Sequence, residues 1–265
     1  MGGSNEDTLK VHDDGGVRFL ELSRPAVLNA LNAAMLGELS IQVQRLREDP
    51  NIRAVVISGS GERAFCAGAD LDEIALATPD QVQSLLARGQ SVFRSLERCG
   101  VPTIAAVDGY ALGGGFELAL SCTFVIGSER AQFGFPEAGL GLIPGYGGTQ
   151  RLPRVIGLGR ARRLMFMGER LKATEAYELG LLTSPPADAG EAVQVASELA
   201  HRISKRSSSA VRTILELTDA GGEAALAHET ARAAFATTTL DAVEGIRAFR
   251  EKREPVFAPP DVTLS

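Results

Sequence analysis

Two short apolar runs, at residues 54–58 (AVVIS) and 102–107 (PTIAAV), constrain the fold of this chain most. Continuous apolar runs of this length are typical of strands buried on both faces, as in parallel sheets. Between them, residues 81–96 carry apolar side chains at helical spacing. A strand, a helix and a further strand in this order predict right-handed βαβ units and a mainly parallel sheet, so we expect an α/β fold.

Two further elements are expected upstream. Residues 17–22 (VRFLEL) alternate enough to form a strand, which Pro25 ends. Residues 29–48 carry a helical stripe of apolar side chains, and Pro50 lies just beyond its end. The alternation of strands and helices therefore begins close to the N-terminus.

Two loops of small residues follow the buried strands, at 67–69 (AGA) and 113–115 (GGG). In open α/β folds ligands bind at the carboxyl ends of strands. Each loop could donate one backbone N–H to the same carbonyl oxygen, and removal of one such donor costs about 3–4 kcal/mol of transition-state stabilisation. The glycine triplet could also serve only close packing, and it lacks the spacing of a dinucleotide fingerprint.

Two glutamates lie just after glycine-rich turns. Glu117 follows the glycine triplet at the expected start of a helix, where a charge that merely stabilises the helix end is the alternative interpretation. Glu137 could be an ordinary loop carboxylate, but its apolar neighbours would raise its pKa by desolvation. Those neighbours are Phe133, Phe135, Pro136, Leu140, Leu142 and Ile143. Two carboxylates in unequal surroundings form an acid/base pair, and backbone donors beside them indicate chemistry on a carbonyl compound.

Other candidate residues are weaker. Cys66 has no histidine nearby, so a buried thiol is favoured over a nucleophile. Asp70 is expected to cap the next helix rather than to act in catalysis. The three histidines have no metal-ligand spacing, so no metal site is expected. The cluster Arg160, Arg162 and Arg163 reads as a solvated helix face.

The composition argues against several kinds of partner. The net charge of −6 and an isoelectric point near 5.3 disfavour nucleic acid or an anionic membrane as the main partner. No apolar run reaches membrane-spanning length, and the polar N-terminus has no signal or transit pattern. The three cysteines show no paired spacing, which favours free thiols in a reducing compartment. We expect a cytoplasmic protein.

The last third of the chain changes character. From about residue 191 to 253 it is rich in alanine and helical in pattern, and the one strand signal near it is at 181–184. We expect an α/β core at residues 1–190 and a C-terminal helical region at residues 191–265. These helices either fold back on the core or form contacts between subunits.

Four segments closely resemble the enoyl-CoA hydratase/isomerase (crotonase) family. They are AFCAGADL (64–71), PTIAAVDGYALGGGFELAL (102–120), FGFPEAGLGLIPGYGGTQRLPRVIG (133–157) and EGIRAFREKREPVF (244–257). RPAVLNAL (24–31) is similar to the family's N-terminal acyl-CoA segment. The resemblance covers about residues 16–257. It implies a spiral of ββα repeats, C-terminal helices that pack trimers or hexamers, and an acyl thioester of coenzyme A as substrate.

The resemblance also implies a role for individual residues. The backbone N–H groups of Ala69 and Gly114 would hold the thioester oxygen, and Glu117 and Glu137 fall on the two hydratase glutamates. The residues implied to bind CoA are Ala26, Leu28, Ala67, Gly68, Ala69, Asp70, Leu71, Gly114, Phe249 and Lys252. Glu117 would activate a water that attacks the β-carbon of a 2-trans-enoyl thioester, and Glu137 would protonate the α-carbon. Coenzyme A is then part of the substrate, and no further cofactor is implied.

Three positions depart from the family pattern, and TTTLDAVEG (237–245) stands where many members have a more acidic turn. Asp72 stands where many members have a lysine near the CoA phosphates, Thr123 replaces an aspartate, and Phe135 replaces a frequent glutamine. Neither glutamate is affected, so a 2-enoyl-CoA hydratase is the expected activity. An enoyl-CoA isomerase, a hydratase for branched or 3-methylglutaconyl-type chains, and a non-catalytic acyl-CoA-binding protein remain alternatives. Chain length, pathway and the choice between trimer and hexamer stay open.

Overall fold

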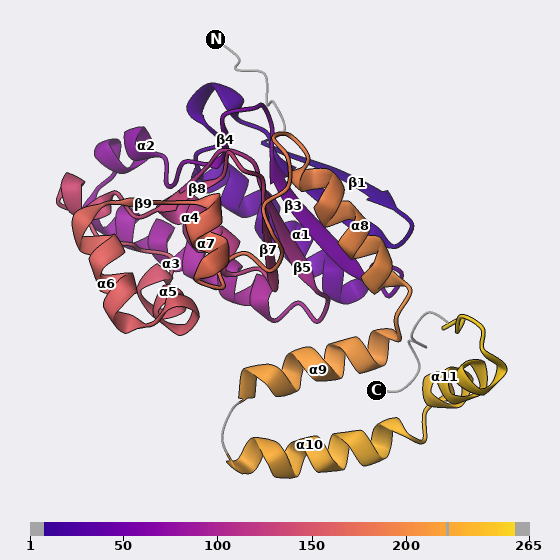
Figure 1. Ribbon diagram of the computed structural model, residues 1–265. Coiled ribbons are helices and arrows are strands. Elements are labelled where there is room, and N and C mark those ends of the chain that lie inside the picture. The colour runs from indigo at the N-terminus through magenta and orange to yellow at the C-terminus, as the bar shows by residue number, and fades with distance from the viewer. Residues whose placement is uncertain (1–7, 221–222, 258–265) are drawn as a thin grey trace.

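The computed structural model describes residues 8–220 and 223–257, and its strands form two sheets (Figure 1). The larger sheet has the order β1-β2-β3-β5-β7, and the smaller has the order β4-β6-β8-β9. The strands are β1 (Leu9–Asp14), β2 (Val17–Leu22), β3 (Ala54–Gly59), β4 (Ala64–Cys66), β5 (Thr103–Val107), β6 (Tyr110–Leu112), β7 (Phe124–Gly127), β8 (Gln132–Gly134) and β9 (Arg170–Lys172).

Both sheets are mainly parallel, as predicted. In the larger sheet the pairs β2/β3, β3/β5 and β5/β7 are parallel, and the hairpin β1/β2 is antiparallel. In the smaller sheet β4/β6 and β6/β8 are parallel, and β8/β9 is antiparallel. Each sheet therefore has one antiparallel pair, at one of its two edges.

Helices connect and cover the strands. The α-helices are α1 (Ala33–Glu48), α2 (Leu71–Leu76), α3 (Pro79–Glu97), α4 (Gly114–Leu120), α5 (Gly148–Ile156), α6 (Leu158–Met167), α7 (Ala173–Glu178), α8 (Ala192–Ser204), α9 (Ser208–Ala220), α10 (Glu223–Ala236) and α11 (Leu240–Glu251). Two short 3-10 helices, η1 (Pro25–Val27) and η2 (Glu137–Leu140), complete the set within the described residues.

The order of these elements repeats along the chain. A strand of the larger sheet is followed by a strand of the smaller sheet and then by a helix: β3, β4 and α2, then β5, β6 and α4. A third turn has β7, β8 and the 3-10 helix η2. The chain therefore winds as a spiral of ββα units, and each turn places a loop after the smaller sheet.

The predicted helices are present with shifted boundaries. The helix expected over 29–48 begins at Ala33, because Leu28 and Asn29 adopt positive φ values of 54° and 58° and the Asn32 side chain caps the helix at Met35 N. The helix expected over 81–96 is α3, which starts two residues earlier, after a capping box formed by Thr78 and Gln81.

The prediction of a strand at 181–184 is wrong. These residues form a bend that is tied to β7 by one backbone hydrogen bond, from Thr183 N to Val125 O. The sequence does not predict β1, which begins in the polar N-terminal segment, or β7. The three-residue strands β4, β6, β8 and β9 were missed as well, since they are too short to show a period.

Apolar side chains pack on both faces of the larger sheet. On one face Val17, Val56 and Ile104 contact the alanines of α8, Ala196 and Ala200. On the other face the sheet packs against α1 and α3, with the fully buried residues Leu20, Ile57, Met35, Leu39 and Phe93. Helix α8 thus covers the sheet, although it follows the proposed boundary at residue 190.

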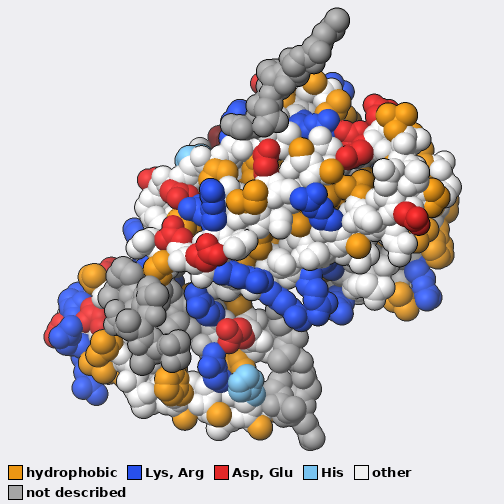
Figure 2. All heavy atoms as spheres, turned by 180° about the vertical axis from the view of Figure 1, so that it is seen from behind, with side chains coloured by type: hydrophobic (Ala, Val, Ile, Leu, Met, Phe, Trp, Pro, Cys, Tyr) orange, Lys and Arg blue, Asp and Glu red, His pale blue; other side chains and the backbone are white. Residues whose placement is uncertain are grey.

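Helices α9–α11 extend away from the two sheets, and we call them the C-terminal arm (Figure 1). Figure 2 shows Lys and Arg side chains gathered along the boundary between this arm and the core. Arg53, Arg206 and Arg212 line the narrow cleft at that junction. Among the described helices, none has the length and apolar character needed to cross a membrane.

Candidate active site

The two small-residue loops lie side by side because they follow neighbouring strands. Loop 67–69 follows β4 and loop 113–115 follows β6, and these strands pair in parallel. A Cβ placed on Gly68 would lie 3.5 Å from Gly114 N, and one placed on Gly114 would lie 3.3 Å from Ala69 N. Gly68 has a φ of 118°, and a Cβ on Gly114 would also lie 2.9 Å from the Tyr146 ring, so both positions favour glycine.

The N–H groups of Ala69 and Gly114 are both available to a ligand. Leu31 N donates to Gly68 O, and Asp70 N donates to Leu31 O. The residues before and after Ala69 therefore bond to Leu31, and these bonds do not use Ala69 N. Gly114 N belongs to the first turn of α4, whose N–H groups have no acceptor within the helix. In the described residues neither N–H donates to a protein group. This pair has the arrangement of an oxyanion hole.

Glu117 lies in the first turn of α4 and is 1% exposed. Its Oε1 accepts the backbone N–H groups of Tyr146, at 2.8 Å, and Gly148, at 2.6 Å. Burial raises the pKa of this carboxyl, and the two N–H donors only partly oppose the shift. A charge that merely caps a helix would face solvent, so the functional interpretation of Glu117 is favoured.

Glu137 begins the 3-10 helix η2 and faces the glycine triplet. A Cβ on Gly113 would lie 2.7 Å from its Oε1, and Gly113 has a positive φ of 49°. Its Oε2 is buried without a protein partner among the described residues. Burial raises the pKa of Glu137 to about 7, and the nearby charge of Glu117 adds to the shift. The two carboxyls thus have unequal surroundings, as an acid/base pair requires.

The predicted source of that burial is only partly right. Phe133 and Phe135 are fully buried, but Leu140, Leu142 and Ile143 are exposed, and Ile143 is 80% exposed. Leu140 ends η2, and Leu142 and Ile143 lie in the loop that follows it. The sequence predicted the direction of the pKa change correctly and assigned it to too many residues.

Phe135 packs behind Glu117. Its ring centroid lies 4.9 Å from that of Phe116, and a Cβ on Gly148 would lie 2.6 Å from Phe135 Cζ and 3.0 Å from Glu117 Cγ. Phe135 therefore supports the segment that holds Glu117.

The predicted CoA segment 24–31 lies against loop 67–71. Ala67 N donates to Leu28 O, and Leu31 forms an isolated parallel bridge with Ala69. The Asp70 carboxylate caps α2 and pairs with Arg24 at 2.8 Å, as its predicted capping role requires. The residues brought together here are Ala26, Leu28, Ala67, Gly68, Ala69, Asp70 and Leu71.

Phe249 and Lys252 are not brought to the same place. Both lie at the end of α11 in the C-terminal arm, which Figure 1 shows away from α2 and α4. Phe249 is 84% exposed, and Lys252 adopts a positive φ of 53° at the C-terminus of the helix. Within one chain these two residues are remote from the carboxylates.

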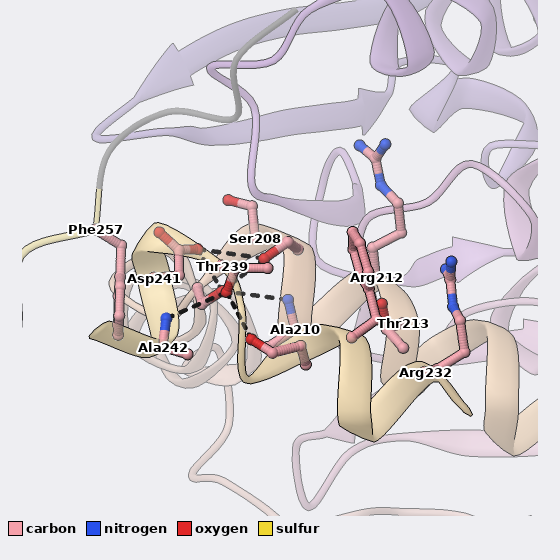
Figure 3. Close-up of a pocket in the computed structure, with 13 residues that line it drawn as sticks. Ser208, Ala210, Arg212, Thr213, Arg232, Thr239, Asp241, Ala242 and Phe257 are labelled. Atoms are coloured by element: carbon pink, nitrogen blue, oxygen red, sulfur yellow. Dashed lines mark hydrogen bonds between the residues drawn. The ribbon is translucent and has the colours of Figure 1, made fainter. Parts of the chain in front are cut away.

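The arm contains a cavity of about 410 Å³ between α9, α10 and α11 (Figure 3). Asp241 accepts the hydroxyl group of Ser207 at one end, and Arg212 and Arg232 line the other part. None of the residues that the sequence predicts for the site lines this cavity.

The remaining candidates do not form a second site. Burial raises the pKa of the Cys66 thiol to about 12, which leaves it protonated and unreactive. His201 lies near Asp14 on the surface of the larger sheet. In residues 8–220 and 223–257, no group of three or more His, Cys, Asp or Glu side chains could hold a metal ion.

The sequence analysis missed the loop that holds Glu117. Tyr146 and Gly148 belong to the run Gly145-Tyr146-Gly147-Gly148, and Gly147 has a φ of 107°. Arg151 fixes this loop by donating to Tyr146 O at 2.6 Å and by pairing with Glu97 of α3. A glycine-rich segment just before a helix was a visible signal, because helix N-termini offer free N–H groups to a carboxylate.

The fold and the segments of this site are shared with known proteins. A family model described as enoyl-CoA hydratase/isomerase matches residues 12–260. A short-chain-enoyl-CoA hydratase from Clostridium acetobutylicum is 38% identical over 91% of this chain and 94% of that protein. A crotonyl-CoA hydratase from Syntrophomonas wolfei is 38% identical over 90% of this chain and 93% of that protein.

Solved structures agree. The crystal structure of an enoyl-CoA hydratase from Bacillus anthracis superimposes with a TM-score of 0.91 at 38% identity, over 94% of this chain and 98% of that one. This likeness confirms the crotonase-like fold that the sequence predicted.

Proposed function

The chain belongs to the enoyl-CoA hydratase/isomerase family, and we propose that it is an enoyl-CoA hydratase. The reaction is the syn addition of water across the 2,3 double bond of a 2-trans-enoyl-CoA to give 3-hydroxyacyl-CoA. Relatives named as hydratases, at 38% identity over nearly the whole chain, support this activity.

One observation carries the proposal: two carboxyls in unequal surroundings lie beside a pair of free N–H donors. Glu137 contacts Gly113, and Gly114 N lies next in the chain, beside Ala69 N. A thioester oxygen held between Ala69 N and Gly114 N would place its acyl carbons near both glutamates. The two donors stabilise the enolate oxygen that develops when a nucleophile adds to the β-carbon.

The proton transfers follow from the states of the two carboxyls. Glu117, whose carboxylate form the N–H groups of Tyr146 and Gly148 stabilise and orient, accepts a proton from the attacking water. Glu137, with its pKa raised to about 7, delivers a proton to the α-carbon. The pair starts and ends with one proton: Glu137 gives its proton to the α-carbon, and Glu117 takes one from the attacking water. Microscopic reversibility then makes Glu137 the base in dehydration. The proposal assigns no metal or redox cofactor to this chemistry, and coenzyme A is part of the substrate.

A direct test is a turnover panel of 2-enoyl-CoA and 3-enoyl-CoA substrates with identification of the products. Loss of the conjugated-thioester absorbance with formation of 3-hydroxyacyl-CoA is the expected result. Failure of every 2-enoyl substrate to turn over would contradict the hydratase proposal.

One observation favours a second activity. Among the carboxyls of the described residues, Glu137 combines a raised pKa with a buried oxygen that has no partner, and one such carboxyl suffices to move a proton between two carbons. Conversion of 3-enoyl-CoA to 2-enoyl-CoA is therefore the alternative reaction. It should persist in Glu117→Gln, which the hydratase reaction should not.

We also propose that copies of the chain assemble as a homotrimer or as a hexamer made of two trimers. The C-terminal arm exposes large apolar side chains that have no partner within the described part of the chain. They include Ile214, Phe235, Leu240, Val243, Ile246 and Phe249. Since Phe249 and Lys252 lie far from the CoA segment of their own chain, assembly is the route by which they reach a bound CoA. Light scattering in solution tests the assembly.

The proposed location is the cytoplasm. Three free cysteines, Cys66, Cys99 and Cys122, fit a reducing compartment, and β-oxidation-type chemistry on acyl-CoA fits the same place. Cell fractionation with an antibody against the chain tests this location.

A further inference from the structure

The side chain of Tyr146 forms an internal wall behind the proposed oxyanion hole. Its ring is wedged between two glycines: a Cβ on Gly114 would lie 2.9 Å from Cδ2, and one on Gly89 would lie 2.3 Å from Cε1. Phe93 packs against it edge-on, with ring centroids 5.4 Å apart. The ring is 1% exposed, and both glycines are needed to make room for it.

A hollow lies on the α3 side of this wall. It measures about 600 Å³ and is lined by residues of α2 and α3 that include Glu73, Leu76, Leu85 and Arg88. Leu85 lines the hollow and precedes Gly89 by four residues on α3, so the two lie on the same face of the helix, and the ring that contacts Gly89 lies beside the lining of the hollow. On its other side the ring touches Gly114, whose N–H belongs to the oxyanion pair. The Tyr146 ring therefore separates the reacting centre from this hollow.

The charges around the hydroxyl group agree with this position. Burial raises the pKa of Tyr146, and the charges of Glu117 and Glu73 add to the shift. Glu117 belongs to the reacting centre and Glu73 lines the hollow.

The hydroxyl group does not hold the ring in place. It is buried and has no hydrogen-bond partner among the described residues. A buried hydroxyl without a partner is unfavourable for folding, so shape rather than hydrogen bonding keeps the ring between the two glycines.

We propose that the ring of Tyr146 sets the upper limit of acyl-chain length, so that the enzyme prefers short-chain enoyl thioesters. The inference rests on the proposed function. A four-carbon acyl group ends near the β-carbon, between the two glutamates. A ten-carbon chain has to continue into the interior, where the ring closes the way to the hollow. Removing the ring joins the two spaces and admits the longer chain.

The experiment compares crotonyl-CoA with decenoyl-CoA. In wild type, kcat/KM should be higher for crotonyl-CoA. In Tyr146→Ala the ratio of kcat/KM for decenoyl-CoA to kcat/KM for crotonyl-CoA should rise by at least about tenfold. The reason is that each further methylene group buried in apolar space strengthens binding of the longer chain. The Tyr146 backbone N–H that binds Glu117 is retained in this variant. Tyr146→Leu, which keeps more apolar volume for folding, should shift the ratio in the same direction.

Two controls isolate the ring. Tyr146→Phe should keep the wild-type ratio because it removes only the hydroxyl group. Tyr177→Ala removes a tyrosine ring that is 42% exposed on α7 and should also leave the ratio unchanged. An unchanged ratio in Tyr146→Ala and Tyr146→Leu, or an equal shift in Tyr146→Phe, would overturn the inference.

A binding measurement separates this inference from the proposed function. Saturated butyryl-CoA and decanoyl-CoA are titrated by calorimetry, which needs no turnover. Tighter binding of decanoyl-CoA to Tyr146→Ala than to wild type supports the proposal that the Tyr146 ring limits chain length, even if no hydration occurs. Equal binding to both proteins contradicts it. Absence of turnover in wild type, by contrast, counts only against the proposed function.

Discussion

Glu117 Oε1 accepts the N–H of Gly148 at 2.6 Å, although the two residues are 31 positions apart in the chain. The same oxygen also accepts the N–H of Tyr146. Glu117 is therefore positioned by the loop at the start of α5 and not only by its own helix. The orientation of one proposed proton acceptor depends on a segment that contributes no side chain of its own to the chemistry.

The first prediction concerns Glu117→Gln. Glutamine has the same shape and its side-chain oxygen can still accept both N–H donors, so we expect a folded protein that binds acyl-CoA. It cannot accept a proton, so kcat for hydration should fall by roughly a hundred- to ten-thousand-fold. Steady-state hydration of crotonyl-CoA measures the effect. Glu129→Gln, which changes an exposed carboxylate, is the matched control and should behave as wild type. A full hydration rate in Glu117→Gln would remove the residue from the mechanism.

The second prediction concerns pH. Hydration starts with one proton on the pair of carboxyls, and dehydration starts with one proton as well. Because the raised pKa of Glu137 is about 7, that proton is lost as pH rises through this value. The kcat/KM values for hydration and for dehydration should therefore fall together above about pH 7. Opposite slopes in the two directions would mean that the pair does not share one proton.

The third prediction concerns Gly113→Ala. The residue has a positive φ, and its new Cβ would lie 2.7 Å from Glu137 Oε1, so the substitution displaces that carboxyl. We expect kcat to fall by at least about tenfold and stability to fall by about 1–3 kcal/mol. Gly141→Ala also places alanine at a positive φ, but in open space. It should lose stability and retain more activity, as thermal melts and turnover assays would reveal. Equal activity losses in the two variants would show that contact with Glu137 is not the cause.

The fourth prediction concerns Asp70→Ala. The variant loses the cap of α2 and the ion pair with Arg24, which hold segments 24–31 and 67–71 together. Loss of the cap should lower stability by about 1 kcal/mol. Since these segments are assigned to CoA binding, KM should rise severalfold while kcat changes little. Glu178→Ala removes an exposed charge at the end of α7 and serves as control. A fall in kcat without a change in KM would contradict the assignment.

Elements with a strong hydrophobic pattern were predictable from the sequence. The runs at 54–58 and 102–107 correspond to β3 and β5, and the stripe within 29–48 corresponds to α1. The smaller sheet was not predictable, because a strand of three residues such as β4 shows no alternation. Strand β4 forms because it pairs in parallel with β6, which lies far from it in the sequence.

The same distinction applies to the site. Glu117, Glu137 and the two loops of small residues were visible because the loops follow buried strands, and ligands in α/β folds bind where strands end. The contact of Glu117 with Tyr146 and Gly148 was not visible, because it joins segments through backbone groups whose position depends on tertiary packing. Sequence therefore indicated the reacting groups better than it indicated what orients them.

The pairing of β4 with β6 has a consequence for how this catalyst can be dissected. The proposed oxyanion donors are main-chain groups that follow two paired strands, so replacing a side chain with alanine does not delete them. An alanine scan therefore does not measure what the two oxyanion donors contribute to catalysis. Only a change to the backbone itself, such as replacing the amide of Ala69 or Gly114 with an ester, would remove one of these N–H donors and leave every side chain in place.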